Sequence, residues 1–211
     1  RNPEQEVMGW ARIRAGEDAQ GDGVFESVCV IPKENEDDQV WCIVKRNIGG
    51  TDKRFIEFFM PEYVTDEWDN INVDCSLTLD NPIDITAATQ SDPVVVTAVA
   101  HGFSDGDQVK ITGVVGMEEL NNEYFLVANK TDDTFELTDL DGNDIDGTAY
   151  TEYISGGEVR KMVTNISGLD HLEGETVAVQ CDGSIPSTET YVVTGGSITL
   201  SQKAAVVHAG L

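Results

Sequence analysis

One acidic stretch has residue types and spacing that could support chemistry: TDLDGNDIDG, residues 138–147. It places Asp139, Asp141 and Asn143 at alternate positions, as the first three ligands of an EF-hand calcium loop are placed. The rest of that pattern fails, because position six is Asp144 where a glycine is needed and position twelve is a tyrosine where a glutamate is needed. We therefore interpret the stretch as an acidic hairpin turn, in which Asp-Gly pairs are common, and predict no metal site.

The chain has three histidines, His101, His171 and His208, which are far apart in the sequence. A hydrolytic triad needs a nucleophile within reach of a base, and no GxSxG elbow is present. We predict turn positions for His101 and His171. With 39 acidic residues, no pair of carboxylates stands out as a glycosidase pair. The sequence predicts no catalytic residue, no cofactor and no enzyme activity.

The four cysteines, Cys29, Cys42, Cys75 and Cys181, form no CxxC motif and have no histidine at metal-ligand spacing. In a symmetric hairpin Cys29 and Cys42 would lie opposite each other and could touch. A disulfide there would require an oxidising compartment. We favour two reduced core thiols, since the neighbouring residues are apolar and cysteine is often buried.

Three tryptophans, Trp10, Trp41 and Trp68, are candidates for stacking on sugar rings. Trp10 and Trp41 fall within predicted strands, and we expect them to pack in the fold. Trp68 lies among polar residues and is expected to be the more exposed one.

The charge of the chain is its most unusual property. It has 39 acidic and 13 basic residues, a net charge of −26, and the acidic residues are spread along the whole length. The closest cations are the pairs Lys45–Arg46, Lys53–Arg54 and Arg160–Lys161, each with acidic residues nearby. A DNA-binding surface needs clustered cations, so we predict no tight DNA binding. No apolar run is long enough to cross a membrane.

Short strands and turns make up the predicted fold, which is all-β. Four runs, residues 7–14, 24–31, 40–46 and 54–60, hold Val, Ile, Phe or Trp and are separated by Gly, Asp, Asn or Pro. Such short connections favour antiparallel neighbours. This predicts a four-stranded antiparallel meander similar to one β-propeller blade.

The spacing of strands and turns divides the rest of the chain. Residues 83–160 hold short strands separated by glycine-containing turns, which predicts a small β-barrel. Residues 1–82 would contain the meander and the first strands of a β-sandwich-like module, and residues 161–211 the remainder of that module. The barrel would then be an inserted domain. Three domains in series is the alternative.

Two segments carry resemblances to known families. The segment AHGFSDGDQVKITGVVGMEELNNEYFLVANKTDDTFELTDLDG resembles the first catalytic cysteine half-domain, named from ubiquitin-activating enzymes and common in phage tail proteins. Matching features are HGF followed by GDQV, the GMEELN turn, and the FLVAN and DTFEL strands. No cysteine lies between Ile83 and Arg160, so the resemblance implies the fold of that domain without its chemistry.

The flanking segments GVFESVCVIP, DDQVWCIVKR, RFIEFF, ISGLDHLEGETVAVQCDG and SITLSQKAAVVHAGL look like the tail nozzle, or tail tubular, proteins of short-tailed phages. The resemblance implies a β-propeller platform and β-sandwich modules assembled as a ring around the DNA exit channel. It predicts a fragment of a structural protein of the virion tail, assembled in the host cytoplasm, whose partners are further copies of itself, the portal or adaptor, and other tail proteins.

A binding module is the alternative function, in which the inserted barrel contacts a host-surface glycan or another tail protein. A concave aromatic groove would favour binding, flat apolar patches would favour assembly, and a pocket with paired titratable groups would favour catalysis.

Overall fold

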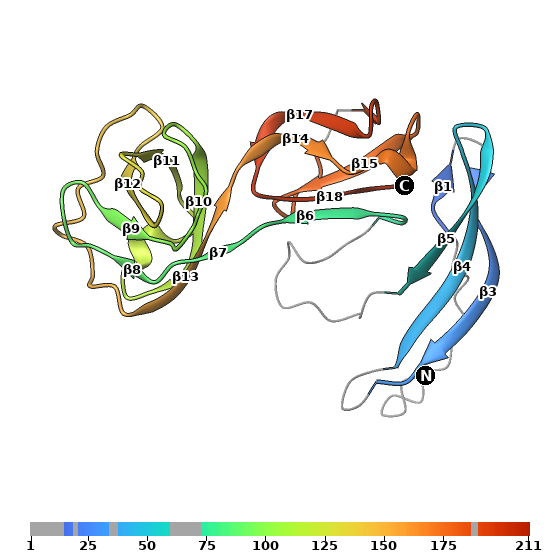
Figure 1. Ribbon diagram of the computed structural model, residues 1–211, viewed down its shortest axis with the longest axis horizontal. Coiled ribbons are helices and arrows are strands. Elements are labelled where there is room, and N and C mark those ends of the chain that lie inside the picture. The colour runs from blue at the N-terminus through green and yellow to red at the C-terminus, as the bar shows by residue number, and fades with distance from the viewer. Residues whose placement is uncertain (1–14, 19–20, 34–37, 60–72, 187–189) are drawn as a thin grey trace.

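The computed structural model describes residues 15–18, 21–33, 38–59, 73–186 and 190–211, and in this part the chain is all-β apart from two single-turn 3-10 helices (Figure 1). The described strands form an N-terminal sheet, a curled seven-stranded sheet and a third group of two sheets near the C-terminus. The all-β prediction is confirmed.

The N-terminal sheet is an antiparallel meander in the order β3–β4–β5. The sequence predicts a turn over residues 47–53, but the strands extend further and a two-residue turn, Gly49–Gly50, joins them. Both glycines have positive φ, 58° and 78°, which this tight hairpin turn requires. The predicted strand at residues 7–14 lies outside the described residues, so a fourth strand stays a prediction. A short β1–β2 hairpin precedes the sheet; the bounds are β1 Glu17–Asp18, β2 Gly21–Asp22, β3 Val24–Ile31, β4 Gln39–Ile48 and β5 Thr51–Phe58.

The curled sheet forms the predicted small barrel, in the strand order β7–β13–β10–β11–β12–β9–β8. One continuous segment, residues 83–88, joins its two edges. The N–H of Ile85 donates to the carbonyl of Gly157 in β13, and the N–H of Thr86 donates to the carbonyl of Thr97 in β9. The strands are β7 Ile83–Asp84, β8 Ala87–Ala88, β9 Val95–Thr97, β10 Gln108–Val115, β11 Tyr124–Ala128, β12 Thr134–Thr138 and β13 Ser155–Lys161, with the 3-10 helix η2 at Glu118–Leu120.

Alternation of apolar and polar residues along these strands places one set of side chains inside the barrel. In β12, for example, Phe135 and Leu137 are fully buried, and Glu136 between them is not. The barrel core consists of side chains from residues 85–159: Ile85, Val94, Val96, Ala98, Phe103, Val109, Ile111, Val114, Met117, Leu120, Phe125, Val127, Phe135, Leu137 and Val159.

The C-terminal module has two antiparallel sheets, β14–β17 and β16–β15–β18–β6, which share a second core. Strand β6 precedes the barrel in the sequence, whereas its partner β18 lies at the end of the described chain. The chain therefore leaves the module after β6 and re-enters it at β14, so that the barrel is inserted between them. The elements are β6 Leu77–Asp80, β14 Val163–Ser167, η3 Asp170–Leu172, β15 Thr176–Cys181, β16 Tyr191–Val192, β17 Ser197–Ala204 and β18 Val206–Gly210.

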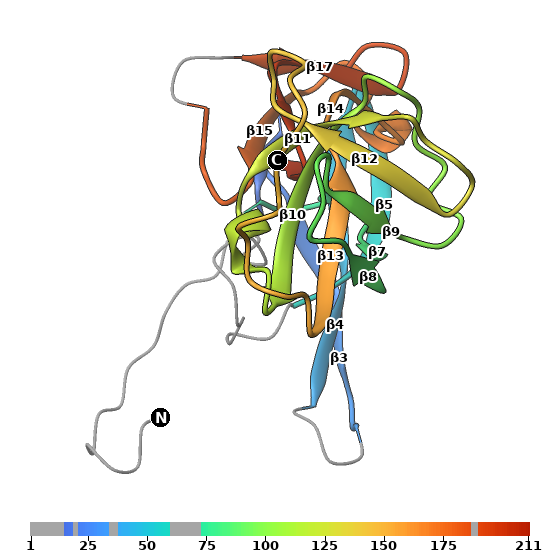
Figure 2. The same ribbon diagram turned by 90° about the vertical axis from the view of Figure 1, so that its left-hand side faces the viewer.

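Among the described residues, the contacts between the N-terminal sheet and the core of the C-terminal module lie at one end of the sheet. Ile48 and Phe55 pack against the module's core, and the N–H of Gly49 donates to Oε1 of Glu175 at 2.9 Å. The opposite end of the sheet, where β3 meets β4, extends away from the barrel and the module (Figure 2). Most of β3 therefore has no layer of described residues packed against it.

Cys29 and Cys42 do not face each other, which corrects the predicted pairing. The register pairs Cys29 with Trp41 and Cys42 with Val28. Directly paired residues share a face and successive residues alternate, so the two thiols project from opposite faces. A shift of one residue from a symmetric hairpin is enough to cause this. Cys42 is buried as expected and Cys29 is exposed. All four cysteines lie in the described part of the chain, and none of them forms a disulfide there.

Candidate functional site

The acidic stretch at residues 138–147 forms a turn in which the Asp139 carboxylate is an internal acceptor. Its Oδ1 accepts the backbone N–H groups of Asp141 and Asn143 at 2.9 and 2.8 Å, and its Oδ2 accepts the side-chain amide of Asn143 at 2.8 Å. These contacts, the amide of Asn143 first among them, lower the pKa of Asp139. The three candidate ligands are therefore close together, but both carboxylate oxygens of Asp139 already accept hydrogen bonds from within the turn. Among the described residues no cluster of three or more His, Cys, Asp or Glu side chains has metal-binding geometry.

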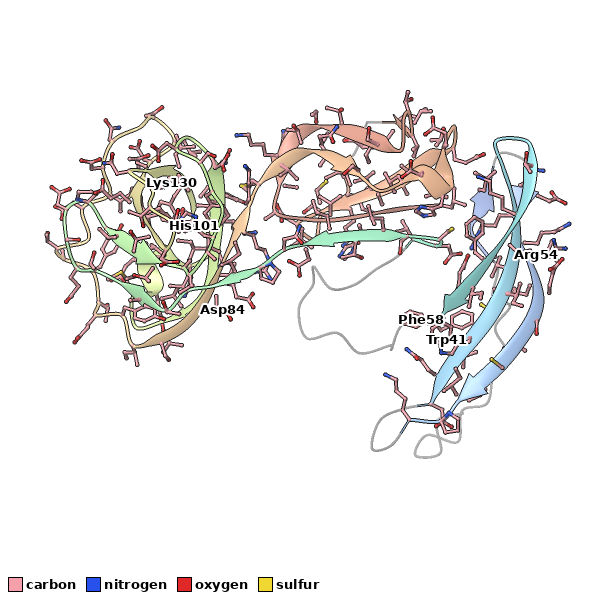
Figure 3. All side chains as sticks on the ribbon, viewed as in Figure 1. Trp41, Arg54, Phe58, Asp84, His101 and Lys130 are labelled. Carbon is pink, nitrogen blue, oxygen red and sulfur yellow. The ribbon has the colours of Figure 1, made fainter. Side chains whose placement is uncertain are left out.

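The three histidines lie apart and each has a structural neighbour. His101 is inside the barrel (Figure 3), where Nδ1 accepts the N–H of Phe103 at 3.0 Å. Its imidazole packs against the Phe103 ring in a tilted arrangement and against the Phe135 ring edge-on. His171 lies in η3 and contacts the carbonyl of Cys75, and His208 in β18 contacts a threonine hydroxyl of β6. His101 and His171 thus contact backbone groups, whereas His208 contacts a side-chain hydroxyl.

The barrel and the C-terminal module meet at a polar junction. Arg160 of β13 donates through Nε to Oδ1 of Asp80 in β6 at 2.7 Å, and its Nη2 lies 2.8 Å from Oε2 of Glu158. Lys110 of β10, directly opposite Arg160 in the register, is buried. Burial lowers the pKa of Lys110 and the charge of Asp182 opposes that shift. The junction thus places two of the chain's cations against acidic side chains of the module.

Two hollows open along this junction. One, of about 640 Å³, is lined by Asp80, Lys110, Glu158 and Arg160 among others. The second, of about 760 Å³, includes Tyr124 together with Gln108, Gln202 and Lys203. Tyr124 is 40% exposed, and Nζ of Lys110 lies 5.6 Å from the centroid of its ring. Side-chain amides and one aromatic face are groups that bind sugar hydroxyls and sugar rings.

The main exposed apolar surface lies on the N-terminal sheet. We call face A the side that carries Cys29, Ile31, Trp41, Ile43, Ile56 and Phe58, which the β3–β4–β5 register places together. Ile56 is 74% exposed, and the rings of Trp41 and Phe58 lie with centroids 5.1 Å apart, next to each other in Figure 3. A shallow hollow of about 270 Å³ on this face is lined by apolar side chains and one serine. Trp41 is half-buried and packs against the Phe58 ring on this exposed face. Trp10 and Trp68 lie outside the described residues.

The opposite side of the sheet, face B, is covered along only part of its length. Cys42, Val44 and Arg46 are buried there. Towards the β3–β4 end, Val28 and Val30 are 66% and 55% exposed on the same face. The end of the sheet away from the module is therefore apolar on both faces, a pattern typical of strands that lie between two packed layers.

Neither the junction nor the exposed apolar end of the sheet is among the features predicted from the sequence. The sequence does indicate the exposed apolar end, because β3 has apolar residues at the consecutive positions 28–31, where a half-buried strand would alternate. We interpreted these residues as part of a core and therefore did not predict an exposed surface. The junction had no signal, since Asp80 and Arg160 are 80 positions apart.

The fold and these surfaces define an all-β protein with an inserted small barrel and an exposed apolar sheet. Residues 91–163 match the family model of the ubiquitin-activating enzyme E1 FCCH domain, the first catalytic cysteine half-domain. The match runs from the segment before β9 to the first residue of β14 and so covers most of the barrel. Comparison with curated proteins gives no match. The resemblance of the barrel is confirmed, whereas the resemblance of the flanks to tail nozzle proteins stays a prediction.

The structure describes no helix that is long and apolar enough to cross a membrane.

Proposed function

We propose that this chain is a structural component of a phage tail, a part of a nozzle or tubular ring protein that surrounds the DNA exit channel. The observation that carries the proposal is the N-terminal sheet, whose outer end presents apolar side chains on both faces. A sheet of this kind leaves apolar surface in water until further layers cover it, as neighbouring blades do in a propeller. Its partners would be further copies of the chain, the portal or adaptor, and other tail proteins.

Three further features support an assembly role. The match of residues 91–163 fits the resemblance of the barrel to a domain common in phage tail proteins. His101, His171 and the acidic turn make structural contacts with backbone groups. The net charge of −26 suits a wall that DNA must pass without being held, because carboxylates repel phosphate. In this role the chain would act in the virion tail after assembly in the host cytoplasm.

Electron microscopy of the full-length protein, purified together with the portal and tail proteins of the same genome, tests this proposal. We expect several copies arranged as a ring on the tail axis, with the barrel projecting from it. Particles that lack the protein, or that hold it away from the tail axis, would contradict the proposal.

A second candidate function is glycan binding at the junction, and the exposed Tyr124 ring beside Gln108 and Gln202 favours it. A host-surface glycan would stack on the ring and form hydrogen bonds with the amides. An immobilised glycan array tests this candidate, with Tyr124→Ala as the site variant and Tyr150→Ala in the barrel as the comparison. Loss of a glycan signal in Tyr124→Ala alone would support the site, and no signal for any glycan would count against it.

A further inference from the structure

We propose that the outer end of the N-terminal sheet packs between two other copies of this same chain, with face A of one copy against face B of the next. This inference rests on the proposed assembly role and assigns the surface that joins the copies. The exposed residues that would be covered are Cys29, Ile31, Ile43, Ile56 and Phe58 on face A, and Val28 and Val30 on face B.

The apolar surface is concentrated on this sheet. Nine of the sixteen large apolar side chains that are exposed in the described chain lie between residues 24 and 59, whereas the other seven are distributed over several loops and strands of the barrel and the module. Single exposed apolar residues are normal in a soluble protein, but a contiguous patch of this kind marks an interaction site. The other exposed apolar residues lie in smaller groups, such as Val115 with Ile154, so the largest apolar surface that another copy offers in its described part is the sheet itself.

Charge also favours contact between copies at this place. Strands β3, β4 and β5 together contain four basic and three acidic residues, which leaves nine basic and 36 acidic residues for the rest of the chain. Two copies that approach through any other region bring strongly negative surfaces together, which opposes association. Through the sheet they bring nearly neutral surfaces together. The cations Lys45 and Arg54 on face A are already paired with Asp52 and Glu26.

The two faces determine the geometry of the contact. A two-fold pair formed by face A against face A would leave Val28 and Val30 exposed on both copies. A contact of face A with face B covers both faces and repeats from copy to copy. Repeated contacts of this kind form a ring when the rotation between copies closes, and a filament when it does not.

The experiment uses two variants that each remove one face. Ile56→Lys introduces a charge into face A and Val28→Lys introduces one into face B, and both side chains are largely exposed, at 74% and 66%, so that folding should be retained. Ile154→Lys, at a barrel position that is 70% exposed, is the matched control. Circular dichroism melts of all four proteins establish that each variant is folded.

Analytical ultracentrifugation up to about 100 µM, where a contact with micromolar Kd is largely occupied, measures the mass of each protein. We expect the unmodified chain and Ile154→Lys to form species larger than a dimer. Each face variant alone should be a monomer. An equimolar mixture of Ile56→Lys and Val28→Lys should form a dimer, because one variant retains face B and the other retains face A.

Several results would overturn the inference: a monomeric unmodified chain, a Val28→Lys protein that dimerises alone, or a mixture of the two variants that remains monomeric. These measurements need no tail particle, so their failure is distinguishable from failure of the proposed function. A ring in tail particles combined with a monomeric chain in solution would reject this surface and retain the assembly role. Self-association in solution combined with absence of the protein from the tail would retain this surface and reject the proposed role in the tail.

Discussion

Arg46 and Glu57 form a two-point ion pair between adjacent strands of the N-terminal sheet. Nε and Nη2 of Arg46 donate to Oε1 and Oε2 of Glu57 at 3.1 and 3.0 Å, and Nη1 donates to the carbonyl of Gly16 at 2.8 Å. The Arg46 residue is 1% exposed. A buried guanidinium of this kind joins the sheet to the segment before β3, and it does so at the end of the sheet that the module covers.

Removal of the Glu57 carboxylate should therefore destabilise the fold. Glu57→Ala would leave the Arg46 charge buried and without its main partner, and we expect the free energy of unfolding to fall by about 3 to 5 kcal/mol. Glu26→Ala is the control, because it removes the carboxylate from Arg54, whose side chain is 60% exposed, and should change stability little. Urea unfolding followed by tryptophan fluorescence measures both. Equal effects of the two substitutions would refute the distinction.

Acid should weaken the turns that are held by carboxylates. Asn143 lowers the pKa of Asp139, and the Thr148 hydroxyl lowers the pKa of Asp146. A carboxyl whose pKa is lower in the folded state stabilises the fold above its unfolded pKa, and this contribution is lost as pH falls through the folded pKa. The melting temperature should therefore decrease as pH falls below about 4, the unfolded aspartate pKa.

The matched pair for this test is Asp139→Asn and Asp141→Asn, since Asp141 joins the turn through its backbone N–H. Asp139→Asn should melt at a lower temperature at neutral pH and lose less stability on acidification. Calorimetry between about pH 7 and pH 2.5 covers the range in which both carboxyl forms occur. The same acid slope in both variants and the unmodified chain would show that the turn is not responsible.

The barrel should be removable. The two cores share no residue, and Asp80 before the barrel lies 2.7 Å from Arg160 at its end, so the ends of the remaining chain are close together. We expect that residues 83–160 can be replaced by a short Gly/Ser link while the rest still folds. A cooperative thermal melt of the deletion protein checks this. An insoluble product, or one without a cooperative melt, would argue that the module depends on the barrel.

Duplex DNA should not bind. Of the grouped cations, Arg46 is buried against Glu57, Arg54 is paired with Glu26, and Arg160 is paired with Asp80. No basic stripe is therefore present on the described surface to displace counterions. Fluorescence anisotropy with a labelled duplex in about 20 mM salt, where screening is weak, is the measurement. Micromolar binding that weakens steeply with added salt would reveal a basic face. It would contradict the proposal that the chain forms a channel wall that does not hold DNA.

Most strands were predictable because their signals are local. Apolar residues beside Gly, Asp and Asn turns identify β3, β10, β11 and β12 without any knowledge of their partners. The turn at residues 138–147 was likewise interpretable from its Asp-Gly pairs. The lengths of the strands were harder to predict. The turn predicted at residues 47–53 is in fact the two residues Gly49–Gly50, because cross-strand hydrogen bonds extend β4 and β5 past the polar residues that indicated a turn.

The sequence by itself determined the all-β class, the small barrel, the acidic turn and the net charge, since each follows from local residue pattern or from composition. It left open whether the barrel is inserted or follows in series. Tertiary structure alone decided the register that separates Cys29 from Cys42, the pairing of Arg160 with Asp80, and the exposure of Val28 and Ile56. Those properties depend on which distant segments pack together. An apolar residue has the same identity in a core and on an interface, so only packing distinguishes the two.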